Sequence, residues 1–347
     1  MLNDSRSEKV LEALEVGNPK RDLDKTRRIS GIAKGATVTP SWMQGDKKYL
    51  TWRDEPSSQT LLICGSPGKG KTLAAISMIE ELSQLRDSED DRDDSIVLAY
   101  FFCDEQDTEK SNALNVLKSL AWQLLKSKRH LFRHFFKEDK AGTQKVDSTE
   151  FDSLLELWRC LKAALSERSL GKVYFLVCGL DQVDSASRKE LMNLITSLRP
   201  RMQEDDNENS GPYLKWLFLS VHREDILEAL QHEMILNLDD GSNSTAQDDA
   251  LHKYVSEKIN ELAKEKGYSR SVEYFIRSFI SFRAKGKSNY DWVDLVCQEL
   301  RSDEKQHIAV RPRLETLPSD LYPMYDQVSS RVSAPDLCLW PICEGQR

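Results

Sequence analysis

A glycine-rich stretch early in the chain has the residue types and spacing of a phosphate-binding loop. Residues 65–72 read GSPGKGKT and satisfy the pattern GxxxxGK[ST]. In such a loop the glycines let main-chain N–H groups turn inward around phosphate oxygens, the last lysine pairs with the β- and γ-phosphates, and the final hydroxyl holds Mg²⁺. The stretch therefore predicts a nucleotide site made of Gly65, Ser66, Pro67, Gly68, Lys69, Gly70, Lys71 and Thr72.

The elements on either side of this loop fit the same interpretation. TLLIC at 60–64 is a short apolar run typical of a buried strand, and residues 72–85 have the pattern of a helix. A helix N-terminus adds a favourable dipole for an anion. An ordinary glycine-rich turn is the alternative. No guanine-reading NKxD-like motif follows, which favours ATP or ADP as the ligand.

The rest of the first two thirds alternates strand-like and helix-like segments. Near-continuous apolar runs predict strands buried on both faces, and these runs are 60–64, 95–102, 172–178, 214–220 and 234–238. Helical patterns lie between them at 111–127, 147–165 and 186–198. The alternation predicts an α/β fold with a mostly parallel sheet, arranged as a three-layer P-loop NTPase and followed by a smaller α-helical region.

Four segments are expected along the chain. We predict a partly helical lead-in at 1–55, a nucleotide-binding domain at 56–240, a helical region at 241–330 and a disordered tail at 331–347. The polar stretch at 241–249 has the composition of a linker.

Composition narrows the function classes. The 347 residues carry a formal net charge of −8, which argues against a broad nucleic-acid-binding face. The N-terminus is polar, and no apolar run approaches the ~20 residues of a membrane span. Seven scattered cysteines without a CxxC pair fit a reducing compartment, and the six histidines form no metal-ligand pattern. We expect a cytoplasmic protein.

Three motifs together resemble a known family. GSPGKGKT, YFFC at 100–103 and VYFLVCGLDQVD at 173–184 are similar to the NACHT domain of the STAND class of P-loop NTPases, in particular to fungal NLR-like proteins and the nephrocystin-type N-terminal domain. In that family the Walker B strand ends in an Asp, followed by a small residue and, three positions after the Asp, a second acid that often precedes a Glu. These places fall on Cys178, Gly179, Asp181 and Gln182, so the Walker B motif is degenerate.

The resemblance implies roles for several residues. Thr72 and Asp181 are the candidate Mg²⁺ ligands, because Cys178 is a poor ligand for this hard cation. Asp184 is an alternative carboxylate. Asp181 and Gln182 are the candidate catalytic pair.

The segment at 214–230 resembles the family's sensor segment, in which a Ser-Arg pair often ends the strand. Ser220 matches, Val221 stands where the Arg is expected, and Arg223 follows two residues later. Arg223 either reaches a γ-phosphate or serves on a surface helix. Trp42 and Trp52, in the lead-in, either pack near the nucleotide base or belong to the core or a hinge.

Several functions remain open on these residues. The first is an ATP/ADP-binding signalling switch with homo-oligomer or NLR-like protein partners and weak Mg²⁺-dependent hydrolysis; its fungal self/non-self role comes from the resemblance alone. The second is a non-hydrolysing nucleotide-binding scaffold, because the metal carboxylate is missing. A small-molecule kinase, with Arg199 and Arg201 as lid residues, and a purely structural interaction module are the others. Neither an effector domain nor a repeat array is recognisable, as in a truncated NLR-like protein.

Overall fold

The computed structural model describes residues 5–30, 41–88, 96–138, 144–197, 212–284, 289–302 and 310–329. The chain divides into two compact units. The first, called the sheet unit below, comprises Met1–Lys25, Lys47–Cys64 and Met78–Leu236. The second, called the helical unit, comprises Thr26–Asp46, Gly65–Ser77 and Asn237–Arg347. The P-loop segment is thus grouped with the helical residues and not with the strand that precedes it.

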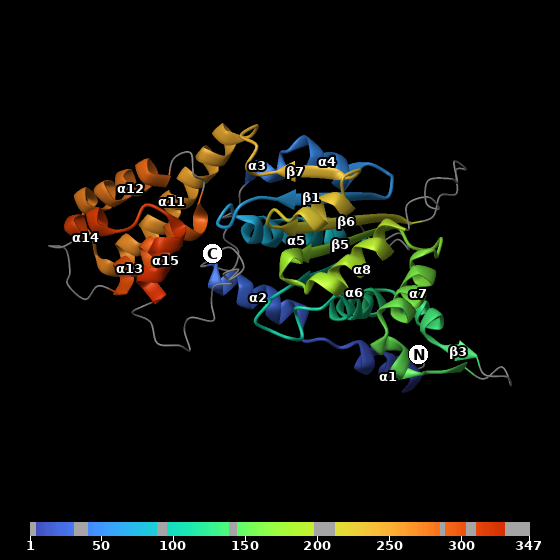
Figure 1. Ribbon diagram of the computed structural model, residues 1–347. Helices are drawn as coiled ribbons and strands as arrows, with labels where there is room; N and C mark the ends of the chain where they lie inside the picture. The colour runs from blue at the N-terminus through green and yellow to red at the C-terminus, as the bar shows by residue number, and fades with distance from the viewer. Residues whose placement is uncertain are drawn as a thin grey trace. The chain divides into compact units, whose positions relative to one another are not determined.

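A five-stranded sheet is the centre of the sheet unit, with the strand order β2-β5-β6-β1-β7 (Figure 1). Its strands are β1 (Gln59–Cys64), β2 (Val97–Phe102), β5 (Lys172–Cys178), β6 (Tyr213–Ser220) and β7 (Met234–Asn237). β2, β5, β6 and β1 run parallel to one another. The predicted α/β class, with its mostly parallel sheet, is confirmed.

The burial of the strands explains why the sequence has continuous apolar runs there and not an alternation of apolar and polar residues. All residues of β1 after the first, and all of β6 after the first, are buried. Helices cover both faces of such a sheet, so both sets of side chains must be apolar. The register then aligns the carboxyl ends of the strands, pairing Cys64 with Ser220, Cys178 with Leu219 and Phe102 with Cys178.

The helices of the sheet unit begin at recognisable caps. Asn112 accepts from the N–H of Asn115 at the start of α6 (Ala113–Ser127), and Ser153 does the same for Glu156 in α7 (Leu154–Leu165). The other helices of this unit are α1 (Ser5–Leu14), α4 (Lys47–Asp54), α8 (Ser185–Thr196) and α10 (Glu224–Ala229). The unit also contains the short 3-10 turns η1 (Arg129–Phe135), η2 (Ser148–Asp152) and η3 (Leu180–Gln182) and the hairpin of β3 (Lys137–Glu138) with β4 (Gln144–Lys145).

Two helices belong to both units, α2 (Pro19–Ile29) and α5 (Lys71–Ser88). The helices that lie wholly within the helical unit are α3 (Ser41–Gln44), α11 (Ser244–Lys266), α12 (Arg270–Ala284), α13 (Tyr290–Ser302), α14 (Val310–Thr316) and α15 (Leu321–Ser329). Apart from the short α3, these helices form a bundle, drawn in orange to red in Figure 1. The predicted smaller helical region is therefore present.

The linker predicted at 241–249 is wrong over most of its length. α11 begins at Ser244, because Gln247 and Ala250 are buried and the amide of Gln247 donates to the carbonyl of Leu238 at 3.0 Å. The polar composition of this stretch indicated a linker, but tertiary contacts stabilise it as a helix. The predicted tail at 331–347, and the lid candidates Arg199 and Arg201, lie outside the described residues.

Among the described residues, no helix is both long and apolar enough to pass through a lipid bilayer.

Candidate nucleotide-binding site

The loop between β1 and α5 has the backbone that its glycines permit. Gly68 and Gly70 both have φ of +80°, a region that residues with a Cβ rarely adopt. The N–H of Lys69 turns back to the carbonyl of Ser66 at 3.4 Å, and α5 begins directly after Gly70. The sequence prediction of a tight glycine-dependent loop ahead of a helix is confirmed.

The two residues expected to hold phosphate and metal follow at the helix start. The ammonium of Lys71 bends back over the loop and donates to the carbonyls of Gly65 at 2.7 Å and Ser66 at 2.8 Å. Thr72 is exposed in the first turn of α5. A cation, a hydroxyl and a positive helix end therefore gather at one place, which is the chemistry that an anionic phosphate chain requires.

An acid from the segment after β7 contacts the first half of the loop. Asp239 Oδ2 accepts hydrogen bonds from the main-chain N–H of Ser66 at 2.6 Å and from its hydroxyl at 2.9 Å. Asp239 Oδ1 lies 3.6 Å from the ammonium of Lys69. Asp239 could not be identified from the sequence, because one acid in a polar stretch is not a motif.

The beginning of α13 contacts the glycines of the loop. The N–H of Tyr290 donates to the carbonyl of Gly68 at 2.7 Å. A Cβ on Gly68 would lie 2.2 Å from Oδ1 of Asn289, and one on Gly70 would lie 3.0 Å from the ring of Tyr290. Asn289 is held in place because its Oδ1 caps α13 by accepting from the N–H of Trp292 at 2.9 Å. Nothing in the sequence pattern pointed to Asn289 or Tyr290.

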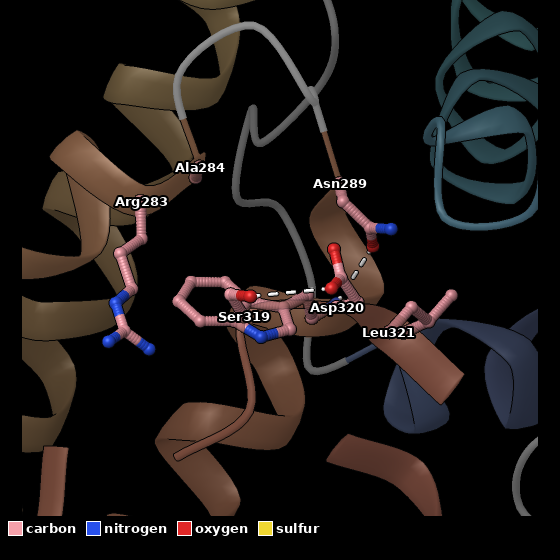
Figure 2. Close-up of a pocket in the computed structure, with 7 residues that line it drawn as sticks. Arg283, Ala284, Asn289, Ser319, Asp320 and Leu321 are labelled. Atoms are coloured by element: carbon pink, nitrogen blue, oxygen red, sulfur yellow. Dashed lines mark hydrogen bonds between the residues drawn. The ribbon is translucent and has the colours of Figure 1, made fainter. Parts of the chain in front are cut away.

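Asn289 also borders a small pocket in the helical unit (Figure 2). Arg283 and Trp292 line it together with Asp320, whose carboxylate accepts from the hydroxyl of Ser319 at 3.3 Å. Its volume of about 50 Å³ gives room for a few water molecules and not for a nucleobase.

Two carboxylates one turn apart on α13 lie in partly buried surroundings. Burial and, to a smaller extent, the neighbouring Asp294 raise the pKa of Asp291 to about 6, while Lys71 opposes the shift. Asp294 is itself paired, with the ammonium of Lys258 at 3.1 Å and the hydroxyl of Tyr254 at 2.7 Å. The P-loop lysine thus interacts electrostatically with an acid of the helical unit.

In the sheet unit, the place of the expected metal carboxylate is filled by a thiol. Cys178 ends β5, is 9% exposed, and accepts at its carbonyl from the N–H of Cys103 at 2.8 Å. Gly179 follows with φ of +80° and donates from its N–H to the carbonyl of Leu219 at 2.9 Å. The side chain at 178 supplies sulfur, which suits Mg²⁺ poorly.

The candidate catalytic pair lies in the turn η3 that follows. Asp181 Oδ1 accepts from the N–H of Val221 at 3.0 Å, so this carboxylate connects the ends of β5 and β6. Gln182 packs against Gly179, and its Oε1 is buried with no hydrogen-bond partner among the described residues. Asp184, the alternative carboxylate, caps α8 by accepting from the N–H of Ser187 at 3.0 Å.

The two sensor candidates, Ser220 and Arg223, differ in their burial and in their contacts. Ser220 is fully buried and its hydroxyl donates to the carbonyl of Val221 at 2.8 Å. Arg223 is exposed, precedes the short helix α10, and lies 3.6 Å from Asp225. Arg223 thus contacts the first turn of α10, and its role at a γ-phosphate stays a prediction.

Arg188, which no sequence motif indicates, supports the turn η3 that follows β5. Only 2% exposed, it donates to the carbonyls of Asp181 at 3.1 Å and of Val183, and its NH2 group lies 2.6 Å from Oδ2 of Asp225. It therefore fixes the backbone of the candidate catalytic turn against α10.

The two tryptophans of the lead-in, Trp42 and Trp52, belong to different units. Trp52 is fully buried in the sheet unit, where its Nε1 donates to the carbonyl of Trp216 at 2.9 Å and its ring packs edge-on against Tyr174. The core-packing interpretation of Trp52 is correct. Trp42 is half-buried in α3 of the helical unit. Within the described ranges, no three His, Cys, Asp or Glu side chains are grouped as a metal site.

A parallel sheet whose first strand leads through a glycine-rich phosphate loop into a helix defines a P-loop NTPase-like nucleotide-binding domain. The family model "Nephrocystin 3, N-terminal" matches residues 38–220, more than half of the chain. The chain belongs to this nephrocystin 3 N-terminal family, and the resemblance inferred from the motifs is confirmed.

The individual proteins and solved structures that align with the chain have low sequence identity to it. Over 330 residues the chain is 26% identical to vegetative incompatibility protein HET-E-1 of Podospora anserina, covering 93% of this chain but only 22% of the length of that protein. A structure of C. elegans PCH-2 aligns with a TM-score of 0.39 and 11% identity over 95% of this chain and 70% of that one. The Aeropyrum pernix ORC2 protein in its ADP form aligns with a TM-score of 0.43 and 11% identity over 84% of this chain and 72% of that one.

Proposed function

We propose that this chain is an ATP- and ADP-binding NACHT-type domain of the STAND class that acts as a nucleotide-dependent signalling switch. The observation that carries the proposal is the loop itself, with its two glycines at positive φ and the ammonium of Lys71 folded over its carbonyls. The relative named as a vegetative incompatibility protein supports a signalling role in self/non-self recognition. We place its action in the cytoplasm, with homo-oligomer or NLR-like protein partners.

The groups of the loop fit the phosphates of a nucleotide, but they supply only part of a Mg²⁺ site. Main-chain N–H groups and Lys71 would bind the phosphates, and the exposed hydroxyl of Thr72 would hold Mg²⁺ together with phosphate oxygens. Bound Mg²⁺ neutralises charge on the phosphates. Asp181 is the nearest carboxylate in sequence to the missing one, and its oxygen is already shared with the N–H of Val221. We therefore expect weak Mg²⁺ dependence and slow hydrolysis.

A second candidate function rests on Cys178. With a thiol in place of the metal carboxylate, the domain would bind nucleotide without turning it over and serve as a scaffold. Such a scaffold would keep nucleotide affinity while showing no measurable phosphate release.

The test of nucleotide binding is a titration with a fluorescent ATP analogue, with and without Mg²⁺, on the wild type and on Lys71→Ala. Lys253→Ala, which removes an exposed lysine of α11, is the matched control for net charge. We expect binding that Lys71→Ala abolishes and Lys253→Ala leaves intact. Equal affinity of the wild type and Lys71→Ala would refute the proposal.

The switch needs a separate measurement. Sedimentation of the apo, ADP and ATP forms would differ if nucleotide controls shape or assembly. Identical sedimentation of all three forms, with nucleotide bound, would instead support a structural interaction module.

A further inference from the structure

The segment between β7 and α11 forms direct contacts with the first two residues of the phosphate loop. A Cβ on Gly65 would lie 2.8 Å from Cβ of Leu238, so the two backbones approach closely there. The next residue, Asp239, accepts from both the N–H and the hydroxyl of Ser66. The segment thus contacts the loop through consecutive residues, one apolar and one acidic.

Asp239 is itself held by contacts on both sides. Its N–H donates to the side chain of Asn237 at 2.9 Å, and the preceding carbonyl of Leu238 accepts from the buried amide of Gln247 at 3.0 Å. Its side chain is 26% exposed, so solvent only partly screens its charge. A carboxylate fixed in this way can impose its position on a flexible, glycine-rich partner.

We propose that Asp239 is a positioning residue of the phosphate loop, acting through Ser66. By binding the main-chain N–H of Ser66, the carboxylate fixes the turn from β1 into the loop, and the following N–H groups are then oriented before any ligand arrives. Such preorganisation reduces the entropic cost of binding. This inference rests on the proposed nucleotide binding and adds a residue that lies outside the loop motif.

Two effects of removing the carboxylate oppose each other. Without Asp239, the ammonium of Lys69 is released toward the phosphates, which would strengthen binding. However, the Lys69–Asp239 distance of 3.6 Å is that of a weak, solvent-accessible ion pair. The two hydrogen bonds to Ser66 at 2.6 and 2.9 Å are short and charge-assisted. We therefore expect the loss of the loop anchor to dominate.

The test compares the nucleotide affinities of Asp239→Ala, Asp239→Asn and Asp240→Ala. Asp240 is the matched control, because it is the adjacent exposed acid and its carboxylate accepts from the N–H and the hydroxyl of Ser242. We expect about fivefold weaker binding of a fluorescent ADP analogue for Asp239→Ala, and about twofold for Asp239→Asn, whose amide oxygen still accepts. Asp240→Ala should match the wild type in affinity, and a cooperative urea transition without nucleotide should show that all three variants are folded.

A double mutant separates positioning from a general charge effect. If Asp239 acts through Ser66, Asp239→Ala loses less affinity in a Ser66→Ala background than in the wild type, because the hydroxyl partner is already absent. Unchanged or tighter binding by Asp239→Ala in the wild-type background would overturn the positioning role, while Lys71-dependent binding of the wild type would still uphold the proposed function. No binding by the wild type would refute both.

Discussion

The main-chain N–H of Tyr290 donates a 2.7 Å hydrogen bond to the carbonyl of Gly68, joining the first residue of α13 to the middle of the phosphate loop. The neighbouring Asn289 fills the space where a side chain at Gly68 would lie. Two residues far apart in the sequence therefore determine each other's conformation. The loop shape depends on α13 as well as on its own glycines.

Gly68→Ala should weaken nucleotide binding at least tenfold. The alanine would have to adopt φ near +80°, which costs about 1 kcal/mol, and its Cβ would lie 2.2 Å from Oδ1 of Asn289. Gly267→Ala is the control, because Gly267 has φ of +65° but nothing lies within 4 Å of its Cβ position. Both variants should lose stability in urea, and only Gly68→Ala should lose affinity. A Gly68→Ala protein with wild-type affinity would show that the loop tolerates a shifted Asn289.

Cys178→Asp should increase the Mg²⁺ dependence of nucleotide binding and raise phosphate release. The change places an oxygen ligand at the end of β5, where the family pattern has one. It should also lower the free energy of unfolding without nucleotide by about 1–3 kcal/mol, since position 178 is only 9% exposed.

Cys178→Asn is the companion variant, with the same shape and no charge. It should share part of the stability loss without the gain in Mg²⁺ dependence, measured as the ratio of dissociation constants with Mg²⁺ and with EDTA. If Asp and Asn gave the same ratio, position 178 would have no access to the metal.

Arg188→Ala should destabilise the protein by about 2–3 kcal/mol. Arg188 is 2% exposed. Its loss removes the guanidinium donor from the carbonyls of Asp181 and Val183 and breaks the 2.6 Å ion pair with Asp225. Arg223→Ala removes an exposed arginine that faces the same Asp225 at 3.6 Å and should cost less than about 0.5 kcal/mol. Urea unfolding of the two variants makes the comparison, and equal losses would contradict the structural role of Arg188.

Asp291→Asn should stabilise the nucleotide-free protein at neutral pH but not in acid. Burial, reinforced by Asp294 and opposed by Lys71, raises the pKa of Asp291 from 3.8 to about 6 in the folded state. A raised carboxyl pKa means that folding favours the protonated form, so its contribution is fully present below pH 3.8 and is lost as pH rises through about 6.

The expected gain for Asp291→Asn is about 2 kcal/mol at pH 7.5, shrinking to zero near pH 4. Urea unfolding between these pH values makes the measurement. The charged groups that act on this carboxyl are Asp294 on the same helix and Lys71 on α5. Asp249→Asn, which removes an exposed acid of α11, is the control and should show no such pH-dependent difference. A constant difference across pH would exclude Asp291 as the titrating group.

Much of the framework follows from local sequence. The run TLLIC, the loop glycines and the helix after Lys71 are specified by residues within one or two turns of one another, so pattern alone located them. The strands β1, β5 and β6 were predictable for the same reason, because a strand buried on both faces must be apolar along its whole length. The sequence also showed that Cys178 stands where the family pattern has an acid, because that pattern has a fixed spacing.

Only the tertiary structure shows which distant residues contact those elements. Asp239 and Tyr290 contact the loop from segments that carry no motif, and Arg188 fixes a turn through main-chain carbonyls that any sequence would provide. The polar residues after Ser244 form a helix because Gln247 and Ala250 are buried against other segments. Each of these contacts depends on packing between distant parts of the chain, which local propensity does not encode.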